Sequence, residues 1–215
     1  MKTKLLIPVL LLIGFAGCIS IKSDYPDIKY YRLKQLPSNF KNVGPISGVL
    51  QIRNFSISEE LDNDQLIALW DNARLQKYYY HRWLSGAAGM ATDFFITRFN
   101  QLGIFKDGTV KSNTILTPEF IMEAQILDMV ARNSTEEAGK KNSAIVTMQI
   151  NIIQRIPLQI EKKIIVSKVY TATAERPNTE AVTIPDAISQ CFSEISDKLL
   201  SDIYASVPQY SEPEK

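Results

Sequence analysis

The chain has 215 residues, and its 24 basic and 23 acidic side chains give a formal net charge of +1. No basic surplus marks a nucleic-acid-binding face, so we expect no nucleic-acid partner. A hydrophobic content of 45% is ordinary for a soluble protein, and no apolar run after the N-terminal one approaches the roughly 18 residues that a membrane-spanning helix needs. Length and composition therefore predict one globular domain with a sizeable core.

The N-terminus has the composition of a secretory signal peptide. Two lysines precede an apolar run over residues 5–16, which at ~1.5 Å per residue is too short to cross a hydrocarbon core of ~30 Å. The residues Phe15-Ala16-Gly17-Cys18 resemble the bacterial lipobox. This resemblance implies cleavage before Cys18 and acylation of its sulfur. The alternative is an ordinary signal peptide followed by an incidental cysteine.

Cleavage at that point would make residues 1–17 the signal peptide. It would leave 22 basic against 23 acidic residues, because Lys2 and Lys4 are lost. Cys191 would then be the one unmodified thiol, so no intramolecular disulfide could form. Residues 18–29 lack periodicity and are predicted to be the lipidated N-terminus and a tether. A single domain over residues 30–207 and a flexible tail over residues 208–215 complete the expected organisation.

The first half of the domain shows strand signals and then a helical one. Strands are expected at residues 30–33 and 48–55, followed by a hairpin of residues 65–70 and 74–80 joined by Asp71-Asn72. Apolar residues at spacings of three and four then predict a helix over residues 85–102, with Ser85 as N-cap and Gly103 as its stop.

The second half returns to strands and ends in a helix. Strands are predicted at residues 119–132, 144–153 and 159–174, the middle one having the clearest alternation in the chain, and residues 133–142 are expected to form an exposed loop. An apolar stripe predicts a helix over residues 184–205 with Cys191 buried in it as a small hydrophobe. The expected fold is α+β: a mostly antiparallel sheet packed against the helices at 85–102 and 184–205.

Few residues of the chain suit catalysis. His81 is the one histidine, so no site with two histidine ligands can form, and no glycine-rich phosphate loop or nucleophile elbow occurs. The acidic pairs at residues 59–60 and 136–137 are expected to be solvated. We therefore predict no enzyme, no cofactor and no metal. A Ser–His–Asp site built on His81 with partners distant in sequence remains an alternative.

The densest aromatic cluster is Tyr78-Tyr79-Tyr80-His81-Arg82-Trp83. Within it Tyr80, His81, Arg82 and Trp83 are the candidates for contact with lipid or a protein partner, because aromatic residues and arginine are enriched at such contacts. The alternative is packing at the point where a strand enters the helix, with the polar tips of Tyr and Trp reaching the surface.

The order of these features resembles the ABC-type transport auxiliary lipoproteins over about residues 28–205. The resemblance rests on Cys18, on Tyr30-Tyr31-Arg32-Leu33, on the strand around residues 49–55 and on the hairpin that ends in His81-Arg82-Trp83 directly before a helix. It also rests on the C-terminal helix around Ala187 and on the strand pair before that helix. It implies a periplasmic lipoprotein that works with an ABC permease and ATPase and with an MCE-domain partner. Such systems move phospholipids or other hydrophobic molecules between membranes. The auxiliary component does no covalent chemistry.

Ile19 follows the cysteine where an acidic residue would favour retention at the inner membrane, so the periplasmic side of the outer membrane is expected. Homo-oligomerisation is left open. Two other functions stay open as well: an envelope-structural or outer-membrane assembly lipoprotein without a transporter, and a lipid-anchored hydrolase that uses His81.

Overall fold

The computed structural model describes residues 26–41, 44–112, 115–134, 141–155 and 162–207. The predicted signal peptide, Cys18, most of the predicted tether, the acidic pair at 136–137 and the predicted tail lie outside these described residues. No helix within the described ranges is long and apolar enough to cross a membrane.

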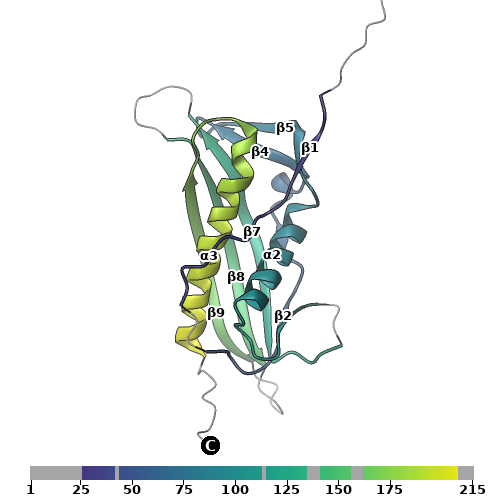
Figure 1. Cartoon of the computed structure of the whole chain (residues 1–215), viewed down its shortest axis with the longest axis vertical. Coiled ribbons are helices and arrows are strands. Elements are labelled where there is room, and N and C mark those ends of the chain that lie inside the picture. The colour runs from purple at the N-terminus through teal and green to yellow at the C-terminus, as the bar shows by residue number, and fades with distance from the viewer. Residues whose placement is uncertain (1–25, 42–43, 113–114, 135–140, 156–161, 208–215) are drawn as a thin grey trace, which may run out of the picture.

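The described residues form a curled mixed sheet of nine strands with two long helices, so the α+β class is confirmed (Figure 1). The helices are α2 (Ala87–Gln101) and α3 (Ile184–Ser206), and two 3-10 turns are η1 (Glu59–Leu61) and η2 (Ala181–Thr183). The strands are β1 (Lys29–Tyr31), β2 (Leu50–Ile52), β3 (Ser56–Ile57), β4 (Gln65–Trp70), β5 (Arg74–Trp83), β6 (Thr109–Lys111), β7 (Phe120–Asn133), β8 (Ser143–Arg155) and β9 (Lys162–Glu175).

Strand β7 is the centre of the sheet. It pairs antiparallel with β8 along nearly its whole length, and β8 pairs antiparallel with β9 in the same way. The expected antiparallel character holds for these long ladders. On its other side β7 pairs in parallel with the short strands β2 and β3 and with β4. The sheet is therefore mixed, and its parallel ladders join segments that are far apart in the sequence.

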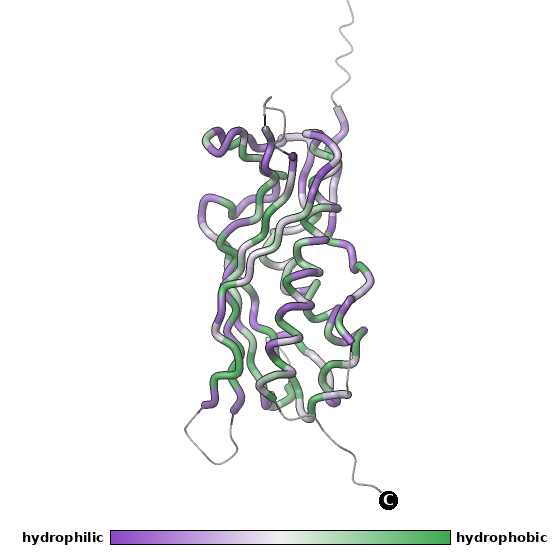
Figure 2. Tube along the Cα trace, turned by 90° about the vertical axis from the view of Figure 1, so that its left-hand side faces the viewer, coloured by the Kyte–Doolittle hydropathy of each residue, from purple (hydrophilic) through white to green (hydrophobic). Residues whose placement is uncertain are grey.

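The main core lies between β7–β9 and the two helices (Figure 2). The alternation along β8 is confirmed, because every second residue from Ala144 to Ile152 is fully buried. The stripe on α3 is confirmed too, and Cys191 is buried within it. A strand has a side-chain period of two and a helix one of 3.6, so one face of each element carries the apolar residues that meet here.

Three local expectations need correction. Helix α2 begins at Ala87 with Gly86 as N-cap, not at Ser85, although Gly103 does follow its end with a φ of 61°. The first strand spans Lys29–Tyr31 and not residues 30–33. Asn133 belongs to β7 instead of the exposed loop; it is buried because its Oδ1 accepts a 2.6 Å hydrogen bond from the guanidinium of Arg176.

The hairpin of β4 and β5 is confirmed, and its turn explains why these residues form it. Asp71 and Asn72 both have positive φ values, 50° and 58°. This left-handed pair matches the right-handed twist of the flanking strands, and Asp and Asn tolerate it better than most residues. Strand β5 runs three residues further than expected, to Trp83.

Candidate functional site

The candidate residues Tyr80, His81 and Arg82 lie where β5 changes its partner. Gln65 of β4 pairs with Arg82, but the next residue, Leu66, pairs with Tyr78. Tyr79, Tyr80 and His81 therefore have no partner on β4 and form a bulge. On the other side of β5, strand β1 pairs in parallel with residues 81–83. Bulges re-aim side chains, and this one divides the aromatic cluster between the two faces of the sheet.

On the inner face, Tyr31, Tyr78 and His81 form one cluster. The Tyr31 hydroxyl and His81 Nδ1 are 2.8 Å apart, and the two rings stack with centroids 5.8 Å apart. The Tyr78 ring meets His81 edge-on at 6.2 Å. Partial burial lowers the pKa of His81, as does the charge of Lys29, and burial raises the pKa of Tyr31. Both shifts favour the neutral form of the group.

This geometry bears on the hydrolase alternative. A histidine acting as base in a nucleophilic site needs a hydroxyl or thiol on one ring nitrogen and an orienting group on the other. Within the described residues, the side chain that bonds to the His81 ring is a tyrosine, and no serine or carboxylate does so. The described ranges also contain no group of three or more His, Cys, Asp or Glu residues placed to hold a metal ion.

On the outer face, Tyr79, Tyr80 and Arg82 form the exposed part of the cluster. The Arg82 guanidinium lies 4.9 Å from the centre of the Tyr79 ring, and its Nε donates to the Tyr79 carbonyl oxygen at 3.0 Å. Its Nη1 donates to Asp64 Oδ2 at 3.1 Å. Tyr79 and Tyr80 meet edge to face with centroids 5.0 Å apart. The two tyrosine rings are fixed by these contacts, yet they stay 57% and 39% exposed.

Trp83 does not belong to the contact surface. Its side chain is 5% exposed and lies in the main core, and its backbone N–H donates to the Asp64 carbonyl oxygen at 2.6 Å. Bulky aromatic side chains gain most when they are removed from water, and Trp83 shares the main core with Ala87, the first residue of α2. For Trp83 the packing interpretation is therefore correct. Tyr80, His81 and Arg82 remain accessible.

A second feature was missed by sequence reasoning. Residues 32–41, which we call the N-terminal strap, cross α2 and α3 after β1 ends (Figure 1). A buried ion pair holds this strap down: Arg98 Nη2 of α2 and Asp197 Oδ1 of α3 are 2.8 Å apart. Arg98 Nη1 donates to the Leu36 carbonyl oxygen at 2.7 Å. The signal was present, because Arg98 follows Phe94 and Phe95 at helical spacing on the buried face of α2.

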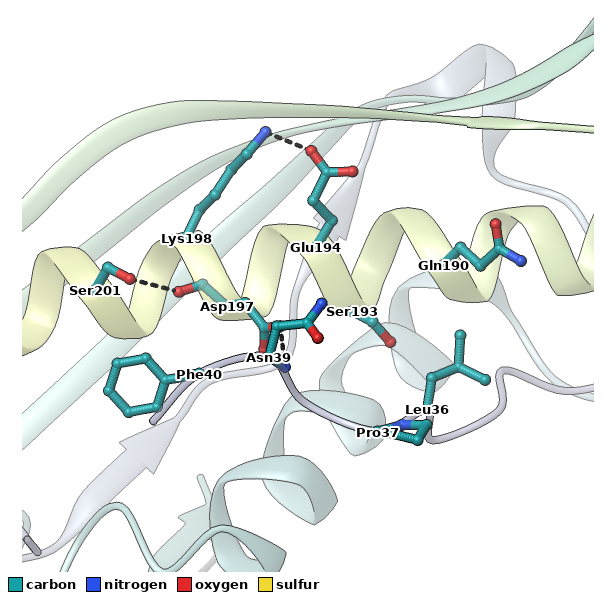
Figure 3. A pocket seen from close by; sticks show the side chains of 10 residues that line it. All are labelled: Leu36, Pro37, Asn39, Phe40, Gln190, Ser193, Glu194, Asp197, Lys198 and Ser201. Atoms are coloured by element: carbon teal, nitrogen blue, oxygen red, sulfur yellow. Dashed lines mark hydrogen bonds and ion pairs between the residues drawn. The ribbon is translucent and has the colours of Figure 1, made fainter. Parts of the chain in front are cut away.

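The strap completes its contacts around Asp197, beside a surface pocket of about 520 Å³ (Figure 3). Ser38 Oγ donates to Asp197 Oδ1 at 2.7 Å, and the Asn39 backbone N–H donates to Oδ2 at 2.9 Å. The pocket is lined by strap residues and by polar side chains of α3 such as Gln190 and Ser193. With Arg98 included, the Asp197 carboxylate accepts from three donors, and the ion pair joins both helices and the strap.

A third polar cluster connects β9 with the end of α3. Asp202 Oδ2 accepts from the Tyr170 hydroxyl at 2.6 Å and from Lys168 Nζ at 2.9 Å. Burial alone would raise the pKa of Asp202, but the hydrogen bonds from Tyr170 and Lys168 and the charge of Lys168 lower it overall. The pKa of Tyr170 is raised far above its ordinary value by burial and by the neighbouring carboxylate. The cluster is a structural link between strand and helix.

Comparisons with known proteins identify the fold. No protein-family model matches the chain, and no curated protein matches it in sequence. Protein XCC0632 from Xanthomonas campestris, assigned to the family DUF330, is similar in structure with a TM-score of 0.66 and 13% identity, over 80% of this chain and 92% of that one. An uncharacterized protein is similar with a TM-score of 0.62 and 9% identity, over 83% of this chain and 99% of that one. The α+β domain therefore has the same fold as a DUF330 protein.

Proposed function

We propose that the protein is a lipid-anchored periplasmic lipoprotein, an accessory component of an ABC-type, MCE-linked system that moves phospholipids or other hydrophobic molecules between membranes. The observation that carries the proposal is Cys18 at the end of a short signal peptide, followed within a dozen residues by a folded domain. Two or three acyl chains on one cysteine hold a protein stably on a bilayer, whereas a single chain does so only marginally.

The order of elements supports the transporter assignment. His81-Arg82-Trp83 ends β5 directly before α2, and Ala187 lies in α3, as in the auxiliary lipoproteins that the sequence resembles. The fold shared with a DUF330 protein agrees with a single domain over most of the mature chain. Ile19 after the cysteine favours the outer membrane as the site of anchoring.

The test uses the full-length precursor expressed in a diderm bacterium, compared with its Cys18→Ala variant. Wild-type protein should stay in the outer-membrane fraction after a high-salt wash, and the variant should be released. Equal retention of both proteins would contradict lipid anchoring.

The partner is tested separately by purification of the wild-type protein in mild detergent. An MCE-domain protein and the ABC permease should co-purify. If the protein is acylated but neither component is recovered, the transporter role is wrong, and an envelope-structural lipoprotein is the remaining assignment.

A further inference from the structure

Exposed apolar side chains are concentrated at one place on the surface. Twelve large hydrophobic residues among the described ones are exposed, and six of them lie in or beside β1 and β5. These six are Ile28, Tyr30, Leu75, Tyr79, Tyr80 and Leu84. Monomeric proteins expose apolar residues singly as a rule, and a contiguous group marks a contact surface.

The strand register places most of this group on one face. Tyr30 of β1 pairs with Arg82 of β5, so these two side chains point to the same face of the sheet. Ile28 precedes Tyr30 by two residues and Leu84 follows Arg82 by two, so by strand alternation both point to this face as well. Leu75 pairs with Leu69 of β4, on the face opposite the main core. Tyr79 lies on that face too, beneath the Arg82 guanidinium. We call this surface, with Tyr80 of the bulge, the tyrosine face.

The charge on the two strands is of one sign. Strands β1 and β5 carry Lys29, Arg74, Lys77 and Arg82 and no acidic residue. On the tyrosine face, Arg82 is paired with Asp64, and Lys77, which pairs with Ile67 of the second hydrophobic cluster, is exposed and forms no ion pair with another described residue. Lys29 and Arg74 point to the opposite face, because Lys29 pairs with His81 and Arg74 lies over the Trp70 ring. Tyrosine beside lysine and arginine is the composition found where proteins meet lipid headgroups, because the rings are amphipathic and the cations attract anionic lipids.

The tether ends at this surface. Ile28 is ten positions after Cys18, so a fully extended chain could hold Ile28 no further than about 36 Å from an acylated cysteine. We propose that the tyrosine face lies on the anionic surface of the bilayer to which the protein is anchored. The inference rests on the proposed lipid anchor and adds a second, reversible contact to it.

This contact would orient the domain. The described chain begins at the end of the molecule where β1, β4 and β5 lie, and α3 ends at the opposite end of the long axis (Figure 1). With the tyrosine face on the bilayer, the C-terminal end of α3 and the start of β9 point away from the membrane. That distant end is then free to meet a partner that spans the periplasm.

The experiment uses the mature chain with Cys18→Ser, so that no acyl chain contributes. Binding to vesicles of phosphatidylcholine alone is compared with binding to vesicles that also contain phosphatidylglycerol, by flotation. We expect binding to the mixed vesicles, weakened by salt. A Tyr79→Ser/Tyr80→Ser variant should bind about tenfold more weakly, as expected for the loss of two interfacial rings. Lys77→Glu should bind at least about fivefold more weakly at low salt.

Matched controls lie at the other end of the molecule. Ile164→Ser removes an exposed apolar side chain of β9, and Lys163→Glu reverses an exposed charge of the same strand. Both variants should bind the vesicles within about twofold of the parent chain, since this end faces away from the bilayer. Circular dichroism and urea midpoints confirm that each variant folds. Lys77 is the safer test, because its side chain is exposed and forms no ion pair with another described residue.

Three outcomes would overturn the proposal: no binding of the parent chain to mixed vesicles, equal losses in the β5 and β9 variants, or self-association of the chain that the tyrosine substitutions abolish without any vesicle binding. The lipid anchor is judged independently by the mass of the mature N-terminus. Failure of the tyrosine face is thereby distinguished from failure of the anchor.

Discussion

The buried ion pair between Arg98 and Asp197 allows a sharp prediction, that Asp197→Asn destabilises the fold. The Arg98 side chain is 3% exposed and its charge has little access to water, while that of Asp197 is 18% exposed. Loss of one partner of such a pair leaves an uncompensated charge and typically costs about 3–5 kcal/mol. Asparagine keeps one side-chain oxygen, whereas Ser38 donates to Oδ1 and the Asn39 N–H donates to Oδ2. The amide NH₂ would therefore face one of these donors and could not accept from it.

The free energy of unfolding should therefore fall by about 3 kcal/mol, the lower end of that range, because Asp197 keeps some contact with water. Asp186→Asn is a matched control on the same helix. Asp186 forms an ion pair with Lys34 of the strap, but both side chains are more than half exposed, so its loss should cost about 1 kcal/mol or less.

Urea unfolding of the mature chain at neutral pH, followed by circular dichroism, measures both values. Arg98→Met added to Asp197→Asn should recover part of the loss, because an apolar side chain then replaces the unpaired cation. Equal destabilisation by Asp197→Asn and Asp186→Asn would refute the reasoning, since it would show that burial adds nothing to the pair.

Three further predictions concern pH and backbone strain. The pKa of Asp202 is lower in the folded protein than its unfolded value of about 3.9, so the ionised carboxylate stabilises the fold above that pH. Asp202→Asn should therefore have a lower free energy of unfolding than wild type at neutral pH, and this difference should vanish as the pH falls below that value. Burial lowers the pKa of His81, so the unfolded chain takes up the proton first. The thermal melting temperature of wild type should therefore fall as the pH is lowered from about 6.5 to about 5. The melting temperature of His81→Gln should not show the part of this fall that comes from the histidine. Asn72 has a φ of 58°, so Asn72→Val should lower the free energy of unfolding by about 1–2 kcal/mol while Asn72→Gly leaves it nearly unchanged; equal effects would contradict the role of the turn.

The sequence predicted the parts of the fold that depend on local periodicity. The alternation in β8 and the stripe on α3 are strong because each element is long and buries one face against the other. The hairpin turn was recognisable because Asp71 and Asn72 suit positive φ. These signals need only residues that are close together in the chain.

What the sequence did not reveal depends on distant pairings. In the parallel ladder between β1 and β5, Lys29 pairs with His81, and no local sequence pattern predicts this pairing. That ladder is what places Tyr30 beside Arg82 and creates the tyrosine face. Trp83 was assigned to a contact surface for the same reason, since its burial depends on core residues that come from distant parts of the chain. Asn133 was assigned to a loop because its hydrogen-bond partner, Arg176, is far away in the sequence.

The central claim is the anchor at Cys18, and the mass of the mature N-terminal peptide from membrane-extracted protein tests it most directly. The account predicts a peptide that begins at Cys18 and carries two or three acyl chains. A peptide with a bare thiol, or a mature N-terminus at another residue, would contradict it.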